Sequence, residues 1–149
     1  MSFLDEKTFD IVLEANTDFG YKLTLIKVEE QCTNHPVTNV PINCVEVETP
    51  IDVTLFTFTG NISTSLDEGS ASQASFTFSK PDPTGGVVQM VLSNTIIKTL
   101  LPLASATRDT YNPRVRFLGY YDVMVLDSAT NANTRVLQGK VYVSDGVTT

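Results

Sequence analysis

The last part of the chain carries the pattern that most constrains the fold: two apolar runs joined by a short polar segment. In the first run, Tyr121, Val123 and Val125 fall on one face of an extended chain, because successive side chains of a strand point to opposite sides. The seven residues SATNANT (128–134) that follow are polar and typical of a turn. The pattern therefore predicts a β-hairpin over 119–143.

Alternating or β-branched runs bounded by turn residues recur through the rest of the chain. Besides the closing hairpin, strands are expected over 9–15, 19–28, 45–48, 51–62, 76–78 and 87–92. Ser93 is suited to cap a short helix over 94–101, which Pro102 would end. Turn signals recur about every ten residues, a spacing typical of a sandwich or barrel. We expect an all-β fold: an antiparallel β-sandwich, immunoglobulin-like or related, of about seven to nine strands with one short helix.

The length of 149 residues predicts one domain over 1–149, large enough to bury a substantial core. Residues 1–8 read as a polar lead, helical or disordered. The composition of 29–41, rich in Asn and Pro, predicts a loop, and 63–75 and 103–118 are expected to be long loops as well. Gly139, inside the last strand, indicates a bulge or the close approach of another backbone.

The net charge of −7 arises entirely in residues 1–52, which hold ten acids and three bases. An acidic balance argues against nucleic acid as a partner, since phosphate contacts require clustered Lys and Arg. No apolar run approaches the roughly 20 residues of a membrane helix, and the first residues do not resemble a signal peptide. We therefore expect no membrane partner and assembly in the cytoplasm.

The chain has two cysteines, Cys32 and Cys44. In a chain without a secretion signal, two cysteines twelve residues apart are expected to be free, partly buried thiols. His35 lies near Cys32, but a zinc site needs four well-spaced ligands, and no further Cys or His is present to complete one. We expect no metal and no other cofactor.

The sequence lacks a recognisable catalytic set. His35 is the only histidine, so it would have to activate any Ser or Cys nucleophile; a pair with Cys44 is conceivable, but no local signature supports it. The strand carboxylates alternate with apolar residues, which is typical of solvated faces. Gly85-Gly86 is not followed by the Lys-Ser/Thr pair of a phosphate loop. We expect no enzymatic activity and no small-molecule substrate.

One loop concentrates residue types that are enriched where proteins dock. The candidate assembly contacts are Arg108, Tyr111, Arg114, Arg116 and Phe117. In the alternative interpretation, the arginines only solvate a surface loop. An acidic N-terminal third and an arginine-bearing loop in one molecule would suit head-to-tail assembly between copies.

Several segments, in order, match a known pattern. They are FDIVLEANTDFGYKLTL (9–25), TPIDVT (49–54) before the aromatic run LFTFTGNI (55–62), VQMVLSNTIIKTL (88–100), GYYD (119–122) and LQGKVYV (137–143). Together they resemble a β-rich module of tailed-bacteriophage structural proteins, which includes N-terminal domains of baseplate and fibre-attachment proteins. TPIDVT is the most specific of these elements, and the stretches 29–44 and 63–75 depart from the pattern.

The resemblance implies a non-enzymatic virion protein: a tail, baseplate or neck adaptor that docks a fibre or neighbouring subunit. The expected partners are copies of itself and other virion proteins, and the expected location is the virion, assembled in the host cytoplasm. Two alternatives remain open. One is a capsid decoration or head-fibre protein; the other is a carbohydrate-binding module for host attachment, which the absence of Trp disfavours.

Overall fold

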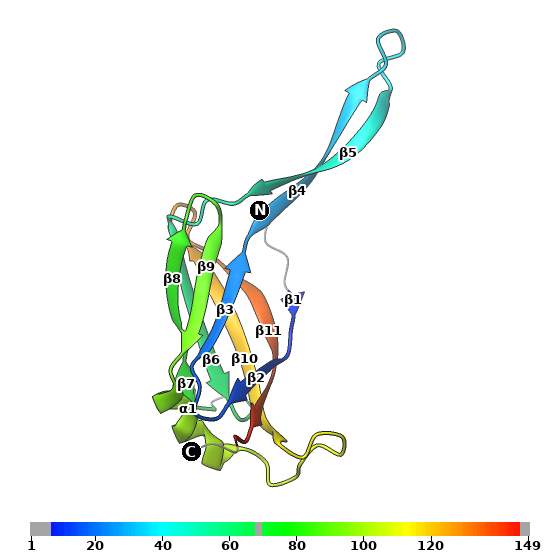
Figure 1. Ribbon diagram of the computed structural model, residues 1–149. Coiled ribbons are helices and arrows are strands. Elements are labelled where there is room, and N and C mark those ends of the chain that lie inside the picture. The colour runs from blue at the N-terminus through cyan, green and yellow to red at the C-terminus, as the bar shows by residue number, and fades with distance from the viewer. Residues whose placement is uncertain (1–6, 68–69, 147–149) are drawn as a thin grey trace.

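The computed structural model describes residues 7–67 and 70–146, and the expected all-β fold is confirmed. Two sheets pack face to face, and a separate hairpin extends far from them (Figure 1). The strands are β1 Lys7–Thr8, β2 Ile11–Glu14, β3 Phe19–Thr24, β4 Ile26–Asn34, β5 Pro41–Pro50, β6 Phe56–Ser63, β7 Ala74–Ser75, β8 Thr77–Asp82, β9 Val87–Leu92, β10 Val115–Asp127 and β11 Ala132–Ser144.

The larger sheet has the order β1-β11-β10-β6-β7, with β2 also paired to β11. Strands β1 and β2 run parallel to β11, whereas β10 is antiparallel to both β11 and β6. Gly139, in β11, lies against the link between β1 and β2, and a Cβ atom on it would stand 2.1 Å from the Phe9 carbonyl oxygen. The predicted close approach of another backbone at this glycine is thus confirmed.

The closing hairpin is the centre of this sheet. Tyr121, Val123 and Val125 share one face, as the alternation predicts, and the structure shows that this face is the buried one. The connection is shorter than expected: β10 ends at Asp127 and β11 begins at Ala132, because 132–134 pair with 125–127. Asn131 closes the turn with a positive φ of 58°, a conformation that asparagine tolerates better than most residues.

The second sheet has the order β3-β9-β8 and packs on the first through a common apolar core. The helix α1 Asn94–Leu100 lies across one end and buries Ile97 and Leu100. Ser93 caps this helix as predicted, since its side chain accepts a hydrogen bond from the backbone N–H of Ile96. A 3₁₀ turn, Leu101–Leu103, follows it. In the described residues no helix is long enough and apolar enough to cross a membrane.

The strand predicted over 51–62 begins only at Phe56. Asp52 accepts hydrogen bonds from both the backbone N–H and the hydroxyl of Thr54, at 2.9 and 2.5 Å. These local bonds favour a turn in TPIDVT over an extended strand. The β-branched composition of this stretch therefore predicted the wrong first residue for the strand.

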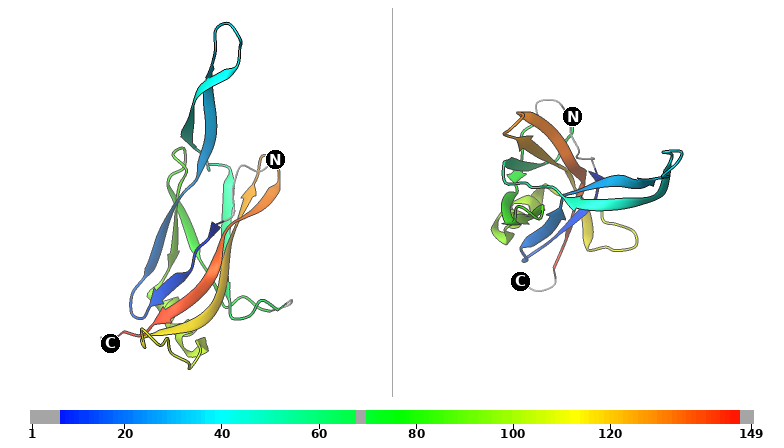
Figure 2. Two further views of the ribbon diagram at one scale, coloured as in Figure 1. Left: turned by 90° about the vertical axis from the view of Figure 1, so that its right-hand side faces the viewer. Right: turned by 90° about the horizontal axis from the view of Figure 1, so that it is seen from above.

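The loop predicted over 29–41 is wrong. Strands β4 and β5 pair over most of their length to form a hairpin, which we call the arm (Ile26–Pro50). Only residues 35–40 form its tip. The arm extends from one end of the sandwich, as both side views show (Figures 1 and 2).

The other predicted irregular stretches are partly ordered. In the predicted lead 1–8, Lys7–Thr8 is strand β1, and the rest lies outside the described residues. The long loop over 63–75 is a connection between Ser63 and strand β7, with 68–69 outside the description. The long loop over 103–118 ends earlier than expected, because β10 begins at Val115.

Candidate assembly surfaces

The arm exposes both faces of a two-stranded ribbon. Register places Val28 opposite Glu48, and Glu30 directly opposite Glu46, so that one face carries three carboxylates beside an exposed valine. Lys27 pairs with Glu29 at 2.6 Å on the other face. The buried core contains no residue between 26 and 50. The arm therefore lies entirely outside the hydrophobic core, and its residues form part of the molecular surface.

A disulfide joins Cys32 and Cys44 across the arm, so the expectation of free, partly buried thiols is wrong. Both cysteines are exposed, and the antiparallel pairing of β4 with β5 brings their Cα atoms to 4.1 Å. Glu30 lies beside both sulfur atoms, but sulfurs joined to each other are not thiolates and do not make a metal site with it. The bond fixes the outer half of the arm covalently.

The tip of the arm is an ordered turn. The His35 ring nitrogen Nδ1 accepts hydrogen bonds from the backbone N–H groups of Val37 and Thr38, at 3.1 and 3.2 Å. The His35 backbone N–H donates to the carbonyl of Val40. His35 therefore shapes the turn, and Cys44 offers it no thiol to activate. Val37 is 85% exposed at the end of this turn, an unusual position for an apolar side chain on a shaped tip.

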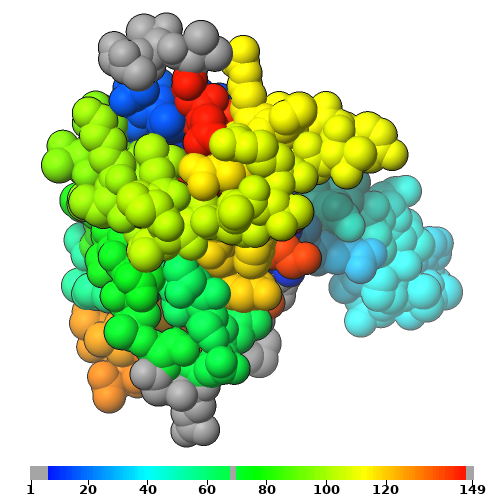
Figure 3. Space-filling view, turned by 90° about the horizontal axis from the view of Figure 1, so that it is seen from below, coloured from blue at the N-terminus to red at the C-terminus, as the bar shows by residue number. Residues whose placement is uncertain are grey.

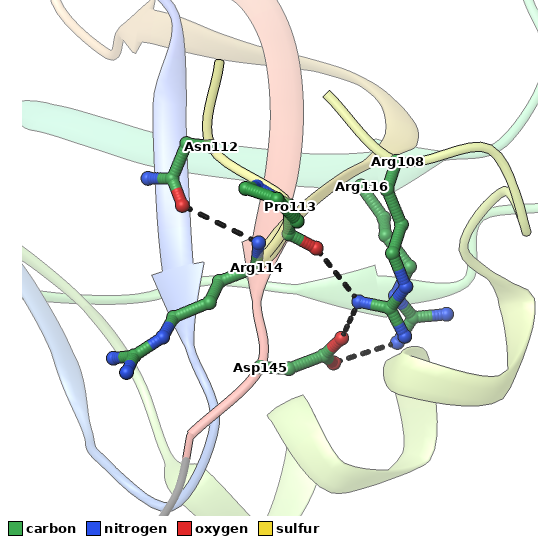
Figure 4. Close-up of polar contacts among 6 residues, drawn as sticks. All are labelled: Arg108, Asn112, Pro113, Arg114, Arg116 and Asp145. Carbon is green, nitrogen blue, oxygen red and sulfur yellow. Dashed lines mark hydrogen bonds and ion pairs between the residues drawn. The ribbon is translucent and has the colours of Figure 1, made fainter. Parts of the chain in front are cut away.

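The predicted contact segment within 103–118, which we call the arginine loop, lies at the end of the molecule opposite the arm, where it projects past the body (Figure 3). Two of its arginines are held within the chain: Asp145 pairs with Arg108 through one carboxylate oxygen and with Arg116 through the other (Figure 4). The Arg116–Asp145 distance is 2.9 Å. Hydrogen bonds from these two guanidinium groups lower the pKa of Asp145 below its ordinary value of 3.8.

The remaining predicted contacts have different environments. Tyr111 is 96% exposed, on a turn in which Asp109 accepts hydrogen bonds from the backbone N–H groups of Tyr111 and Asn112. Arg114 is exposed and its guanidinium points away from Asp145 (Figure 4). Phe117 lies in β10 and packs edge-on against Tyr120 and Tyr142. Arg108 and Arg116 thus meet at Asp145, whereas Tyr111 and Arg114 face solvent.

Two grooves lie on the sandwich. The first, of about 480 Å³, runs between the two sheets where β1 and β3 form their edges; we call it the seam groove. Its lining includes the apolar residues Phe9, Tyr21, Leu23, Ile26, Val28 and Val136. Phe9 and Tyr21 stack across it with ring centroids 5.0 Å apart. Lys7 and Lys22 also line it, and none of the described residues in its lining is acidic.

The second groove, of about 580 Å³, lies on the outer face of the larger sheet. Most of the residues that line it carry polar side chains, among them Asn61, Tyr120, Gln138 and the ion pair Asp122–Arg135, whose closest atoms are 3.2 Å apart. We call it the polar groove. It places these hydrogen-bonding groups beside the rings of Tyr120 and Tyr121.

Two further groups have shifted pKa values, and both have structural causes. Burial raises the pKa of Tyr121, whose hydroxyl donates to the carbonyl of Phe9 between β1 and β2. The hydrogen bonds from Thr54 lower the pKa of Asp52. Both pKa shifts therefore reflect the packing of Tyr121 and the local turn at Asp52.

The sequence predicted the arginine loop as a contact surface but missed the arm and the seam groove. One signal could have revealed the arm: Cys32 and Cys44 are flanked by short runs rich in valine and glutamate on both sides of the His-Pro turn. No known protein-family model matches this chain, and no curated protein matches it either.

Proposed function

We propose that the chain is a non-enzymatic structural subunit that joins its neighbours in a larger particle. The observation that carries this proposal is the arm. It is a disulfide-bonded ribbon outside the core, and it ends in a hydrogen-bonded turn with exposed valines. A two-stranded hairpin exposed on both faces is marginally stable by itself. A function in which the arm is covered by another subunit accounts both for its apolar surface and for its covalent reinforcement.

We propose further that the particle is the virion of a tailed phage, with the chain as a tail, baseplate or neck adaptor that docks a fibre or neighbouring subunit. This rests on the sequence resemblance given above. The disulfide is compatible with it, because virion surfaces are among the places where disulfides persist. The arm and the arginine loop lie at opposite ends of the molecule, an arrangement suited to linking one subunit to the next (Figures 1 and 2).

The test is made on particles. Virions purified from cells that carry the gene should contain the chain in a fixed ratio to the major structural protein, and a label fused at its C-terminus should repeat symmetrically at the tail, baseplate or neck in electron micrographs. A label on the head would favour the capsid decoration or head-fibre alternative. Recovery of the chain only in the particle-free fraction would refute the virion proposal.

A second candidate function, carbohydrate binding, rests on the polar groove. Its ring of Tyr120 beside Asn61, Asp122, Arg135 and Gln138 offers stacking and hydrogen bonds to a sugar. Binding of the purified chain on a glycan array, lost in Tyr120→Ala and retained in Tyr142→Ala, would favour a host-attachment module. A blank array would leave the adaptor as the proposed function.

A further inference from the structure

We propose that the seam groove is the acceptor for the arm of a second copy of this chain. The inference rests on the proposed structural function, because it specifies one contact within such an assembly. It is argued from the edges that the groove exposes, from the charges on groove and arm, and from the place where the arm is attached.

The groove exposes two strand edges. In the described part of the chain, β3 pairs only with β9, and β1 only with β11, so that each has one edge free. Free edges carry unpaired backbone N–H and C=O groups that can accept an added strand. At about 480 Å³ the groove has room for a few side chains of an extended segment and none for a folded domain. A strand at the edge of a ribbon such as the arm would insert only the few side chains that this volume holds.

The charges of groove and arm are complementary. Lys7 and Lys22 line the groove, and among the residues described neither forms an ion pair. On the arm, Glu30 and Glu46 stand directly opposite each other, which is an unfavourable like-charge pairing. A lysine contributed from outside would relieve this repulsion. The apolar side chains beside each set, Val28 on the arm and Phe9 in the groove, would be covered in the same contact.

The occupant must come from another molecule. Ile26 and Val28, at the base of the arm, are themselves part of the groove lining. The paired strands then lead away from the body for about eight residues, or roughly 25 Å at 3.3 Å per residue. The tip cannot return to its own groove without separating the strands that the disulfide holds together. Two copies that exchange arms would close a two-fold dimer, whereas copies that each pass the arm to the next would form a ring or a filament.

The test is a charge exchange followed by sedimentation velocity over a range of concentrations at low salt. One variant carries Glu30→Lys and Glu46→Lys; the other carries Lys7→Glu and Lys22→Glu. Each alone should self-associate about tenfold more weakly than the original chain, because arm and groove then have the same sign. A mixture of the two should associate again, because each arm now meets a groove of opposite charge. Lys98→Glu with Lys140→Glu is the matched control and should behave like the original chain.

A second measurement does not depend on the folding of charge variants. A photo-crosslinking residue placed at Val37 of the otherwise unchanged chain, mixed with isotope-labelled chain, should give crosslinks between copies that map to 7–28. Crosslinks between copies that map elsewhere, or a chain that stays monomeric at every concentration, would overturn this inference. A chain that is monomeric alone but still incorporated into particles through a different protein would overturn the inference and leave the proposed function standing.

Discussion

At Gly139 the packing of the larger sheet leaves no room for a side chain. A Cβ atom there would lie 2.1 Å from the Phe9 carbonyl oxygen and 2.7 Å from its carbonyl carbon, both backbone atoms. Gly139→Ala should therefore displace the β1–β2 segment and lower the free energy of unfolding by about 1–3 kcal/mol in denaturant titrations. Gly20→Ala is the control: the nearest atom to its Cβ is the end of the Gln89 side chain at 3.6 Å, so the free energy should be unchanged or slightly raised.

The ion pairs of Asp145 predict a dependence of stability on pH. Because the folded-state pKa of Asp145 lies below 3.8, the carboxylate stabilises the fold fully above about pH 5, and this contribution is lost as the pH falls through the folded-state value. Asp145→Asn should therefore reduce the unfolding free energy by about 1 kcal/mol at pH 7 and by much less near pH 3. Tyr111→Ala, which changes an exposed side chain outside these ion pairs, should leave the unfolding free energy close to that of the original chain at both pH values.

Among the elements, the arm depends most on a single covalent bond. Replacing Cys32 and Cys44 with Ser removes a cross-link that stabilises a loop of this size by about 3 kcal/mol. We expect hydrogen exchange to accelerate throughout 30–46 while the amides of β10 and β11 keep their protection, because no arm residue belongs to the core. Equal acceleration in arm and body would show that the two unfold together.

The arginine loop calls for variants that separate docking from folding. Replacing Arg108 or Arg116 would break the pairing with Asp145, so a loss of assembly would be ambiguous. Tyr111→Ala with Arg114→Ala alters the exposed residues alone, and it should weaken subunit association severalfold while the thermal midpoint stays within a degree or two. Unchanged association by sedimentation would show that this loop is not a contact.

For the molecule as a whole, the position of the core predicts that the sandwich folds without the arm. Replacing 30–46 with Asn-Gly joins Glu29 to Val47, which are already paired across the ribbon, through a two-residue turn. The shortened chain should unfold cooperatively at nearly the same denaturant midpoint and should be monomeric in sedimentation velocity. A molten product, detected by loss of near-ultraviolet circular dichroism, would show that the arm contributes to the fold.

Local patterns were enough to predict much of this architecture. Alternation placed Tyr121, Val123 and Val125 on one face, the Ser93 cap marked the start of the helix, and Gly139 marked a close backbone approach. Each depends on residues near in sequence or on the absence of a side chain. The arginine loop was proposed as a contact from its composition, but the pairing of Arg108 and Arg116 with Asp145, which lies 37 and 29 residues further along the chain, was not predicted.

What the sequence by itself determined is the class of the fold, because the two-residue period of a half-buried strand is written in the order of apolar and polar residues. Only the tertiary structure decided which strands pair and which segment, the arm, lies outside the core. Within the arm, alternation predicted only the short strand 45–48, because the composition of 29–41 is mostly polar and typical of a loop. Cross-strand pairing is what brought Cys32 to Cys44. The seam groove likewise exists only because two sheets leave their edges open side by side, a relation between segments that no local pattern encodes.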